Sequence, residues 1–129
     1  MKAIIMFFFL TGMSITCYCQ SPDSLYMLSM DAYDDEDYAA SAKHFSELIV
    51  IKGFALSSRW LYNGACSFTL NGDTQQALKI LEYLAEEKHY SNFSHINSDG
   101  DLEALHSSPR WKTLLTKVAA NKESEPQRN

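Results

Sequence analysis

The chain has no excess of basic residues and no sequence motif of a known catalytic or metal site. Lysine and arginine number 11 against 16 aspartates and glutamates, so the formal net charge is -5. An acidic chain without a basic stripe argues against nucleic acid or an anionic membrane surface as a partner. The four histidines show no metal-ligand spacing, and neither a G-x-S-x-G elbow nor an H-E-x-x-H pair is present. We therefore expect no cofactor and no enzymatic activity, although a site assembled from distant residues stays open.

Only one long apolar run is present, and it lies at the start of the chain. Lys2 is followed by an unbroken apolar stretch from Ala3 to Leu10, and Cys17 and Cys19 then stand as small residues two apart. This order is typical of a signal peptide, so residues 1–19 are predicted to be removed. The run is shorter than the roughly 20 residues of a membrane span. We expect a secreted or periplasmic protein without membrane insertion after signal removal.

A lipid-anchored N-terminus is the alternative to a cleaved one. Lipoproteins usually have a small residue before the modified cysteine and an aliphatic residue three places before it. Neither Cys17 nor Cys19 fits this pattern well. After cleavage only Cys66 remains, and one cysteine cannot form an internal disulfide. Because Cys66 lies in an apolar helical stretch, it is predicted to be a small buried residue or a free thiol.

Apolar residues recur at intervals of three and four, which predicts helices throughout the mature chain, and no alternating strand pattern of useful length is present. Ser21-Pro22 and Ser108-Pro109 are helix-start signals, and Ser98 with Asp101 resembles a capping box. The expected order is a helix from 22 to about 33, a turn over 34–37, helices over 38–51 and 57–70, a turn over 71–73, a helix over 74–87, an aperiodic linker over 89–97, a short helix over 98–105 and a helix over 109–118. Residues 20–118 should form one all-α domain, and 119–129 a disordered tail.

The first pair of predicted helices superposes on the second with an offset of 36 residues. Ser41 aligns with Ala77, and Phe45 aligns with Leu81. A small residue lets the second helix of a pair approach the first, and a large apolar residue four positions later fills the space between pairs. A Gly-Asp turn at Gly72 then reverses the chain. The chain therefore contains an internal helical-hairpin repeat.

The second pair and the residues after it carry a more specific pattern of small, turn-forming and apolar residues. It consists of Asn63, Ala65, Cys66, Gly72, Asp73, Ala77, Leu81, Asp99, Asp101, Leu102, Leu105, Pro109 and Trp111. This pattern, over about residues 57–118, resembles the end-of-group variant of the tetratricopeptide repeat (TPR), whose usual period is about 34 residues. Gly64 stands where the variant usually has alanine, and we expect this departure to loosen one helix contact.

The resemblance implies an α-α superhelix of two TPR-like helical hairpins plus a C-terminal helical cap. It also implies a non-enzymatic module that binds a protein or peptide in its concave groove, by analogy of fold. The residues predicted to face this groove are Tyr26, Met30, Tyr33, Arg59, Tyr62, Cys66 and Thr69. Tyrosine and arginine are common anchors of protein interfaces. The alternative is that these aromatic residues pack against the flanking helices.

Two polar features have structural interpretations that we prefer. Asn63 resembles the asparagine with which some TPR domains hold a C-terminal carboxylate, but the basic residues of that clamp are missing. We therefore expect Asn63 to bond to the backbone of an adjacent helix. The run from Asn97 to Asp101 hints at a calcium loop, yet histidines stand where such a loop needs acids. Helix capping explains these acids better than a metal site.

The oligomeric state and the chemistry each leave an alternative. A short solenoid leaves apolar ends exposed, which could drive end-to-end stacking of copies. The predicted helices over 98–117 should cap one end, so we expect a monomer. A small hydrolase or metal-dependent enzyme is the alternative to a binding module. It would be favoured by an exposed Cys66 within hydrogen-bond reach of a histidine.

Overall fold

The computed structural model describes residues 20–124, which form seven helical elements. They are α1 (Pro22–Asp34), α2 (Tyr38–Lys52), α3 (Ser58–Leu70), α4 (Thr74–Glu86), α5 (Phe93–Ser98), the 3-10 helix η1 (Gly100–Leu105) and α6 (Pro109–Ser124). This part of the chain contains no strand, so the all-α prediction is confirmed for it. The predicted signal peptide, 1–19, lies outside the described residues. No helix between residues 20 and 124 is long and apolar enough to cross a bilayer.

Local capping determines where the first hairpin, α1 and α2, begins and turns. Ser21 Oγ accepts a hydrogen bond from the Ser24 amide (3.1 Å), and Pro22 occupies the first turn, where no amide donor is needed. At the turn between the helices, the Asp37 amide donates to the Ala32 carbonyl (2.8 Å). The predicted helix start at Ser21 is confirmed.

The second hairpin, α3 and α4, repeats the backbone conformation of the first. α1 and α3 each have 13 residues, and their capping serines are 36 residues apart. The Asp73 amide donates to the Phe68 carbonyl (2.7 Å), as the Asp37 amide does 36 residues earlier. The residue before each aspartate has a positive φ, 60° at Glu36 and 87° at Gly72. The repeat visible in the sequence is therefore a repeat of turn geometry as well.

The two hairpins pack closely where Gly64 of α3 faces Phe45 of α2. A Cβ atom at position 64 would lie 3.0 Å from Cδ1 of Phe45, a side chain that is only 1% exposed. The absence of a side chain lets the Phe45 ring lie against the α3 backbone. The expectation that Gly64 loosens this contact is wrong, because the ring takes the space that an alanine methyl group would need.

Three fully buried serines link the same helices through their side chains. Ser29 Oγ of α1 donates to the Ser41 carbonyl of α2 (2.9 Å), and Ser41 Oγ donates to Ser67 Oγ of α3 (2.8 Å). Among the described residues, every buried side-chain N and O atom has a partner. Ser41 was predicted to let the helices approach closely. It also connects them through hydrogen bonds.

The chain after α4 is more helical than its sequence pattern indicates. α5 occupies part of the predicted aperiodic linker, and Asn92 caps it by accepting from the His95 amide (3.2 Å). η1 begins after Asp99, whose Oδ1 accepts from the Asp101 amide (3.1 Å). The predicted capping box at Ser98 is wrong, because Asp99 is the capping residue.

The last helix, α6, continues past its predicted end at residue 118. Asn121 is buried, and its side-chain amide donates to the carbonyls of Ala85 (2.7 Å) and Tyr90 (3.0 Å). These bonds hold the C-terminal turns of α6 against the end of α4. Residues 119–124 are therefore helical and do not belong to a disordered tail, while 125–129 lie outside the described residues. The predicted start at Pro109 is confirmed.

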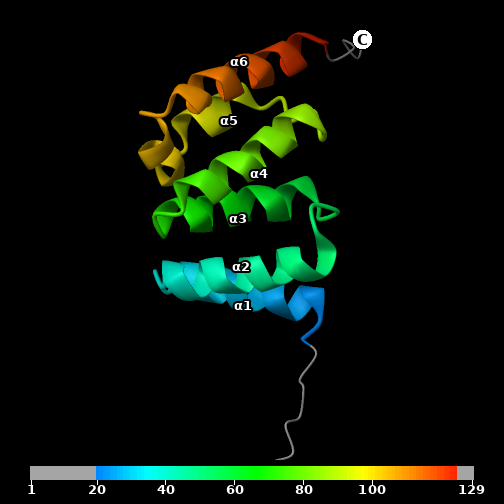
Figure 1. Ribbon diagram of the computed structural model, residues 1–129, viewed down its shortest axis with the longest axis vertical. Coiled ribbons are helices and arrows are strands. Elements are labelled where there is room, and N and C mark those ends of the chain that lie inside the picture. The colour runs from blue at the N-terminus through cyan, green and yellow to red at the C-terminus, as the bar shows by residue number, and fades with distance from the viewer. Residues whose placement is uncertain (1–19, 125–129) are drawn as a thin grey trace, which may run out of the picture.

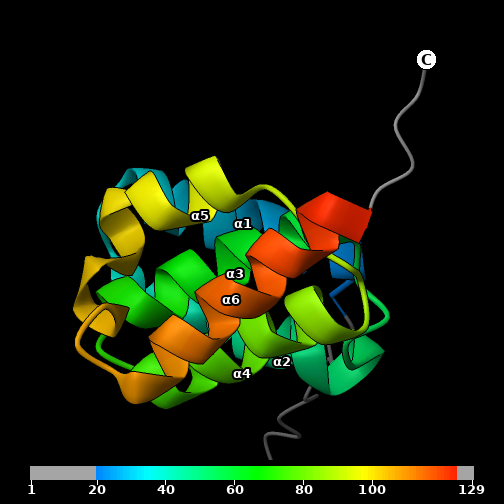
Figure 2. The ribbon, with the colours of Figure 1, turned by 90° about the horizontal axis from the view of Figure 1, so that it is seen from above.

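The helices form a stack with α1 and α2 at one end and α6 at the other (Figure 1). Seen along the stack, α5 lies on the same side as α1 and α3 (Figure 2). This arrangement agrees with two helical hairpins followed by a helical cap. Arg110 fastens the cap, because its guanidinium donates two hydrogen bonds to the Glu82 carboxylate, each 2.7 Å long. The interior is apolar, with Phe45, Leu48, Leu61, Ile80, Leu84, Ile96, Leu102 and Val118 among its buried side chains.

Candidate functional site

A small pocket, which we call the central pocket, lies between α1, α3 and the segment formed by α5 and η1. Its volume is about 150 Å³. Aromatic, acidic and sulfur-containing side chains line it: Met30, Tyr33, Tyr62, Asn63, Cys66, His95, Asp99 and Asp101. Four of the seven predicted groove residues therefore line a pocket together with side chains of the chain's own C-terminal part. The groove of a two-hairpin stack is covered here by α5 and η1.

Two of the predicted groove tyrosines donate hydrogen bonds to carboxylates of the covering segment. The Tyr33 hydroxyl donates to Asp101, and the Tyr62 hydroxyl donates to Asp99 Oδ2 (2.8 Å). Burial, and then the bond to a carboxylate, raises the pKa of both phenols above its ordinary value. Both tyrosines stay protonated and hold the segment against α1 and α3. The alternative of packing against flanking elements thus describes these two residues better than an open groove does.

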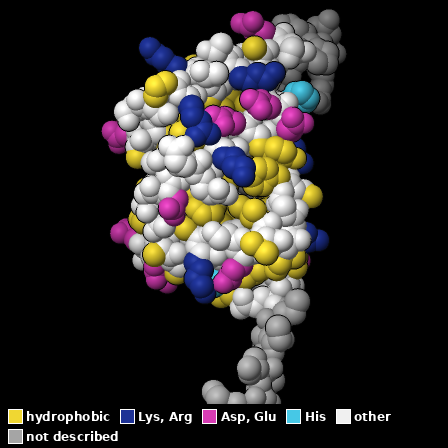
Figure 3. Space-filling view, viewed as in Figure 1, with side chains coloured by type: hydrophobic (Ala, Val, Ile, Leu, Met, Phe, Trp, Pro, Cys, Tyr) yellow, Lys and Arg dark blue, Asp and Glu magenta, His cyan; other side chains and the backbone are white. Residues whose placement is uncertain are grey.

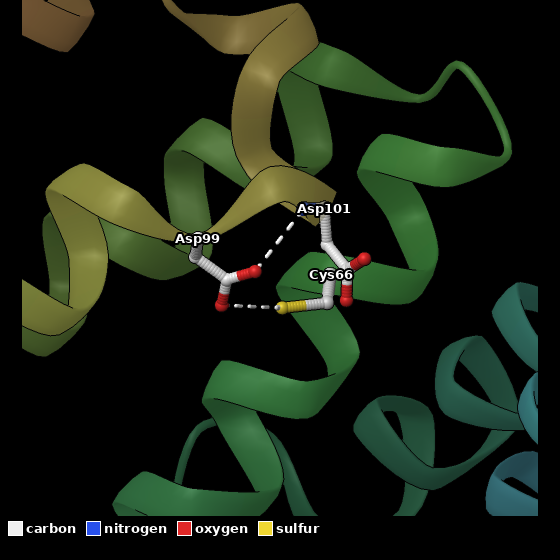
Figure 4. A group of neighbouring side chains, drawn as sticks. All are labelled: Cys66, Asp99 and Asp101. Atoms are coloured by element: carbon white, nitrogen blue, oxygen red, sulfur yellow. Dashed lines mark hydrogen bonds between the residues drawn. The ribbon is translucent and has the colours of Figure 1, made fainter.

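Cys66 lies deeper in the central pocket and is 5% exposed. Its thiol donates a long hydrogen bond to Asp99 Oδ2 (3.9 Å), and Asp101 lies on the other side of it (Figure 4). Burial, followed by the charge of these two carboxylates, raises the pKa of the thiol well above its usual range. A thiol that stays protonated is a poor nucleophile. An exposed cysteine within reach of a histidine would favour an enzyme. Cys66 is instead buried and bonded to a carboxylate.

The sequence analysis missed two aromatic partners of Tyr62, because they lie in the stretch without periodicity. The Tyr62 ring stacks on His95 and on Tyr90, with ring centroids 4.7 and 5.6 Å apart. The Tyr90 hydroxyl and His95 Nδ1 are hydrogen-bonded at 2.8 Å, and burial raises the pKa of Tyr90 to about 12. The asparagine cap before His95 was the one local signal of this helix. These contacts add an apolar layer to the polar bonds that hold the segment.

Tyr26 and Asn63 form a contact at the edge of the central pocket, which Asn63 also lines. The Tyr26 ring stacks on Trp60, with centroids 4.1 Å apart, and its hydroxyl accepts a hydrogen bond from Asn63 Nδ2 (2.8 Å). The same amide nitrogen lies 3.7 Å from the sulfur of Met30. The prediction that Asn63 bonds to backbone is wrong, because its partners are side chains of the preceding hairpin.

Thr69 and Arg59 lie outside the central pocket. Thr69 is buried, and its hydroxyl donates to the Ala65 carbonyl of its own helix (2.8 Å), so its predicted place in an open groove is wrong. Arg59 is exposed and forms no hydrogen bond or ion pair with another residue between 20 and 124. Of the predicted groove residues, Arg59 alone is exposed, whereas Tyr26, Met30 and Tyr33 are partly buried.

Members of the sequence pattern that lie far apart in the chain meet in the central pocket. Cys66 of α3 donates to the Asp99 carboxylate, and Tyr62, the residue before Asn63, donates to the same carboxylate. The remaining members of the pattern serve the fold through burial, turn geometry or helix starts: Ala65, Ala77, Leu81, Leu102, Leu105 and Trp111 are buried, Gly72 has a positive φ, Asp73 is the N-cap of α4 and Pro109 starts α6.

One group of side chains could supply ligand atoms to a cation. The sulfur of Cys66 and carboxylate oxygens of Asp99 and Asp101 all lie within 4.8 Å of one another. Each carboxylate already has a structural task, since both accept a tyrosine hydroxyl and Asp99 also caps η1. The expected capping role is confirmed for Asp99, which caps η1.

A second surface of interest lies on the first hairpin, at the end of the stack formed by α1 and α2. Among residues 20–124, the exposed large hydrophobic side chains all belong to it: Met27 (64%), Leu28 (38%), Val50 (86%) and Ile51 (50%). We call these four residues the first-hairpin surface. A hollow of about 520 Å³ adjoins it, lined by Gln20, Leu25, Lys43, Ser46, Glu47, Val50 and Ile51. Hydrophobic side chains are visible at this end of the molecule (Figure 3).

No protein-family model, curated protein or solved structure matches this chain.

Proposed function

We propose that the chain is an exported, non-enzymatic interaction module of TPR type, which binds a partner protein through the first-hairpin surface. The observation that carries this proposal is the concentration of exposed apolar side chains on one hairpin. Val50 is 86% exposed and Met27 is 64% exposed, while the other end of the stack is covered by α6. Several large apolar side chains exposed on one element of a small protein are typical of a binding site.

The proposal moves the binding site away from the concave groove. A peptide in that groove would have to displace the Tyr33 and Tyr62 hydrogen bonds to Asp101 and Asp99. Breaking a bond between a hydroxyl and a partly buried carboxylate costs about 1.5–3 kcal/mol each time. The first-hairpin surface requires no such rearrangement, and covering it removes apolar side chains from water.

The absence of enzymatic activity is part of the proposal, and the state of Cys66 supports it. Cys66 lines the central pocket together with His95. Its thiol is buried and its pKa is raised. Its hydrogen-bond partner is a carboxylate, which disfavours the thiolate that catalysis would need.

Site-specific photocrosslinking tests the proposal in cells that export the protein. A photoreactive amino acid at position 50 should give a discrete covalent adduct with a protein partner. Position 86 is the matched control, because it is exposed and lies 36 residues later in the second hairpin. No adduct at position 50, or equal adducts at both positions, would refute the proposed surface.

Intact-mass analysis of the exported protein tests the export part. A chain that begins at Gln20 supports signal removal after Cys19. An added diacylglycerol mass on Cys17 or Cys19 would show a lipid anchor instead. A full-length chain found only inside the cell would contradict export.

A further inference from the structure

The first hairpin and α6, the outermost elements of the stack, carry opposite net charge. The first hairpin, residues 22–52, contains seven acidic and two basic residues: Asp23, Asp31, Asp34, Asp35, Glu36, Asp37 and Glu47 against Lys43 and Lys52. α6 contains four basic residues and one acidic residue: Arg110, Lys112, Lys117 and Lys122 against Glu123. Of the basic residues on α6, Arg110 is engaged with Glu82, whereas the three lysines are exposed. Such a separation of charge attracts unlike ends of two molecules to each other.

Both ends also offer apolar surface of matching character. The first-hairpin end presents the branched side chains of Leu28, Val50 and Ile51. The α6 end has a hollow of about 470 Å³ lined by the apolar or small residues Phe93, Leu115, Thr116, Ala119 and Ala120 and by one acid, Glu123. Small residues leave room for branched ones, so the two ends are complementary in shape type as well as in charge.

The internal repeat indicates that the outer face of α1 is a surface for another helical unit. Leu28 corresponds to Gly64, 36 residues later, and Gly64 is covered by Phe45 of the preceding hairpin. Met27 corresponds in the same way to Asn63, which bonds to Tyr26 of the preceding hairpin. Within this chain the positions on α3 are covered by helices and the equivalent positions on α1 are exposed. In repeat stacks such a face is completed by the next helical unit.

In place of the monomer expected from the sequence pattern, we propose that the protein associates head to tail with itself: the first-hairpin end of one copy binds the α5–α6 end of a second copy. This inference rests on the proposed function and names the partner of the same surface. The lysines of α6 then face the acidic first hairpin, and the branched side chains enter the hollow beside Ala119 and Ala120. Because the attraction is between exposed charges, it weakens when salt shortens the screening length.

Two variants with one damaged end each provide the test, measured by size-exclusion chromatography with light scattering. Val50→Glu damages the first-hairpin end, and Ala120→Glu damages the α6 end; both positions are exposed, so the fold should survive. Glu86→Ser is the control for an unrelated exposed position. Circular dichroism and thermal melting should show that all three variants fold as the wild type does.

Head-to-tail association predicts a characteristic result on mixing. The wild type and Glu86→Ser should increase in mass with concentration, and should do so less at about 0.5 M salt than at about 0.05 M. Val50→Glu alone and Ala120→Glu alone should be monomers, because each lacks one end. An equimolar mixture should form a heterodimer, since each variant supplies the end that the other lacks.

Each other outcome contradicts this inference. A monomeric wild type at all concentrations, or a mixture that stays monomeric, overturns it. A dimer of Ala120→Glu alone would show that two first-hairpin ends bind each other instead. If photocrosslinking at position 50 captures a different protein while the wild type is monomeric, the proposed function stands and self-association fails. If position 50 captures nothing and the wild type is monomeric, both fail.

Discussion

The first and second hairpins share their backbone conformation but differ in how much of each is covered by neighbouring helices. Both start with a capping serine, and both turn through a residue of positive φ that precedes an aspartate. The second hairpin is covered on one side by Phe45 of α2 and on the other by η1 and α6, and eight of the 13 residues of α3 are buried. The first hairpin has one covered side, and its other side exposes Met27 and Val50.

This difference shows that a repeat determines the shape of a unit, whereas its neighbours determine its role. At equivalent positions, Gly64 accommodates a ring and Leu28 meets no neighbouring hairpin. The second hairpin is therefore the structural centre of the stack. The first hairpin is the unit whose surface is available for binding, and substitutions at paired positions can test this distinction.

The largest expected contrast is in folding stability. It compares a variant that adds a side chain at position 64 with one that removes a side chain at position 28. Gly64→Leu should destabilise the fold by about 3 kcal/mol, because its side chain must enter space filled by Phe45. Leu28→Ala should cost less than about 1 kcal/mol, since Leu28 is partly exposed and removing it opens no cavity in the core. Urea unfolding monitored by circular dichroism measures both. Equal losses for the two variants would mean that the hairpins are not packed differently.

The next contrast compares the two repeat-related tyrosines, Tyr62 and Tyr26. Tyr62→Phe should destabilise by about 2 kcal/mol, because its hydroxyl donates to the Asp99 carboxylate. Tyr26→Phe should cost about 1 kcal/mol, because its hydroxyl accepts from a neutral amide of Asn63. A double-mutant cycle of Tyr62→Phe with Asp99→Asn isolates the first bond. Additive effects in that cycle would show that this bond does not hold the covering segment.

The fold itself could be predicted from the sequence because its signals are local. Capping residues and a three-four apolar period are properties of neighbouring residues, and they placed α1 to α4 within a residue or two of their observed bounds. α5 was missed because its six residues are too short for a period, and only Asn92 marks its start. The end of α6 was missed because Asn121 resembles a tail residue until its bonds to Ala85 and Tyr90 are seen.

The candidate site was less predictable, because it depends on contacts between distant residues. The groove residues Tyr33 and Tyr62 were identified, but their partners lie 68 and 37 positions away in the chain. No local pattern shows that Asp99 and Asp101 cover the groove. The exposure of Leu28 was equally hidden, because its spacing is that of an inward-facing residue, yet the described residues leave it 38% exposed.

A smaller effect should appear in the pH dependence of stability, because Cys66 and Tyr62 both lie in the second hairpin. The thiol and tyrosine pKa values in the central pocket are raised above their unfolded values of 9.0 and 10.0. Their contribution to stability is therefore present below pH 9 and is lost as the unfolded chain ionises at higher pH. Between pH 9 and pH 10 the wild type should lose on the order of 1 kcal/mol through the thiol. Cys66→Ser, compared by urea unfolding at several pH values, should show a shallower loss; an identical slope would contradict this view.

The smallest contrast concerns the two turns. Glu36 has a φ of 60°, a conformation that glycine adopts without strain and that Gly72 adopts in the second hairpin. Glu36→Gly should therefore stabilise the protein by about 0.5–1 kcal/mol. Gly72→Ala should destabilise it by a similar amount, because its φ is 87°. Thermal melting can resolve both shifts, and a loss of stability in Glu36→Gly would show that the two turns are not equivalent.

Oxidation of side chains by hydroxyl radicals tests the central claim most directly. Met27 and Met30 both lie in α1, so one experiment compares a methionine of the first-hairpin surface with one of the central pocket. In the purified, dilute protein Met27 should oxidise quickly, while Met30, Tyr33 and Tyr62 in the central pocket should oxidise slowly. When the protein is bound in its native assembly, Met27 should become protected and the pocket residues should not change. Protection of Tyr33 and Tyr62 on binding, with Met27 unchanged, would contradict the account and return the binding site to the groove.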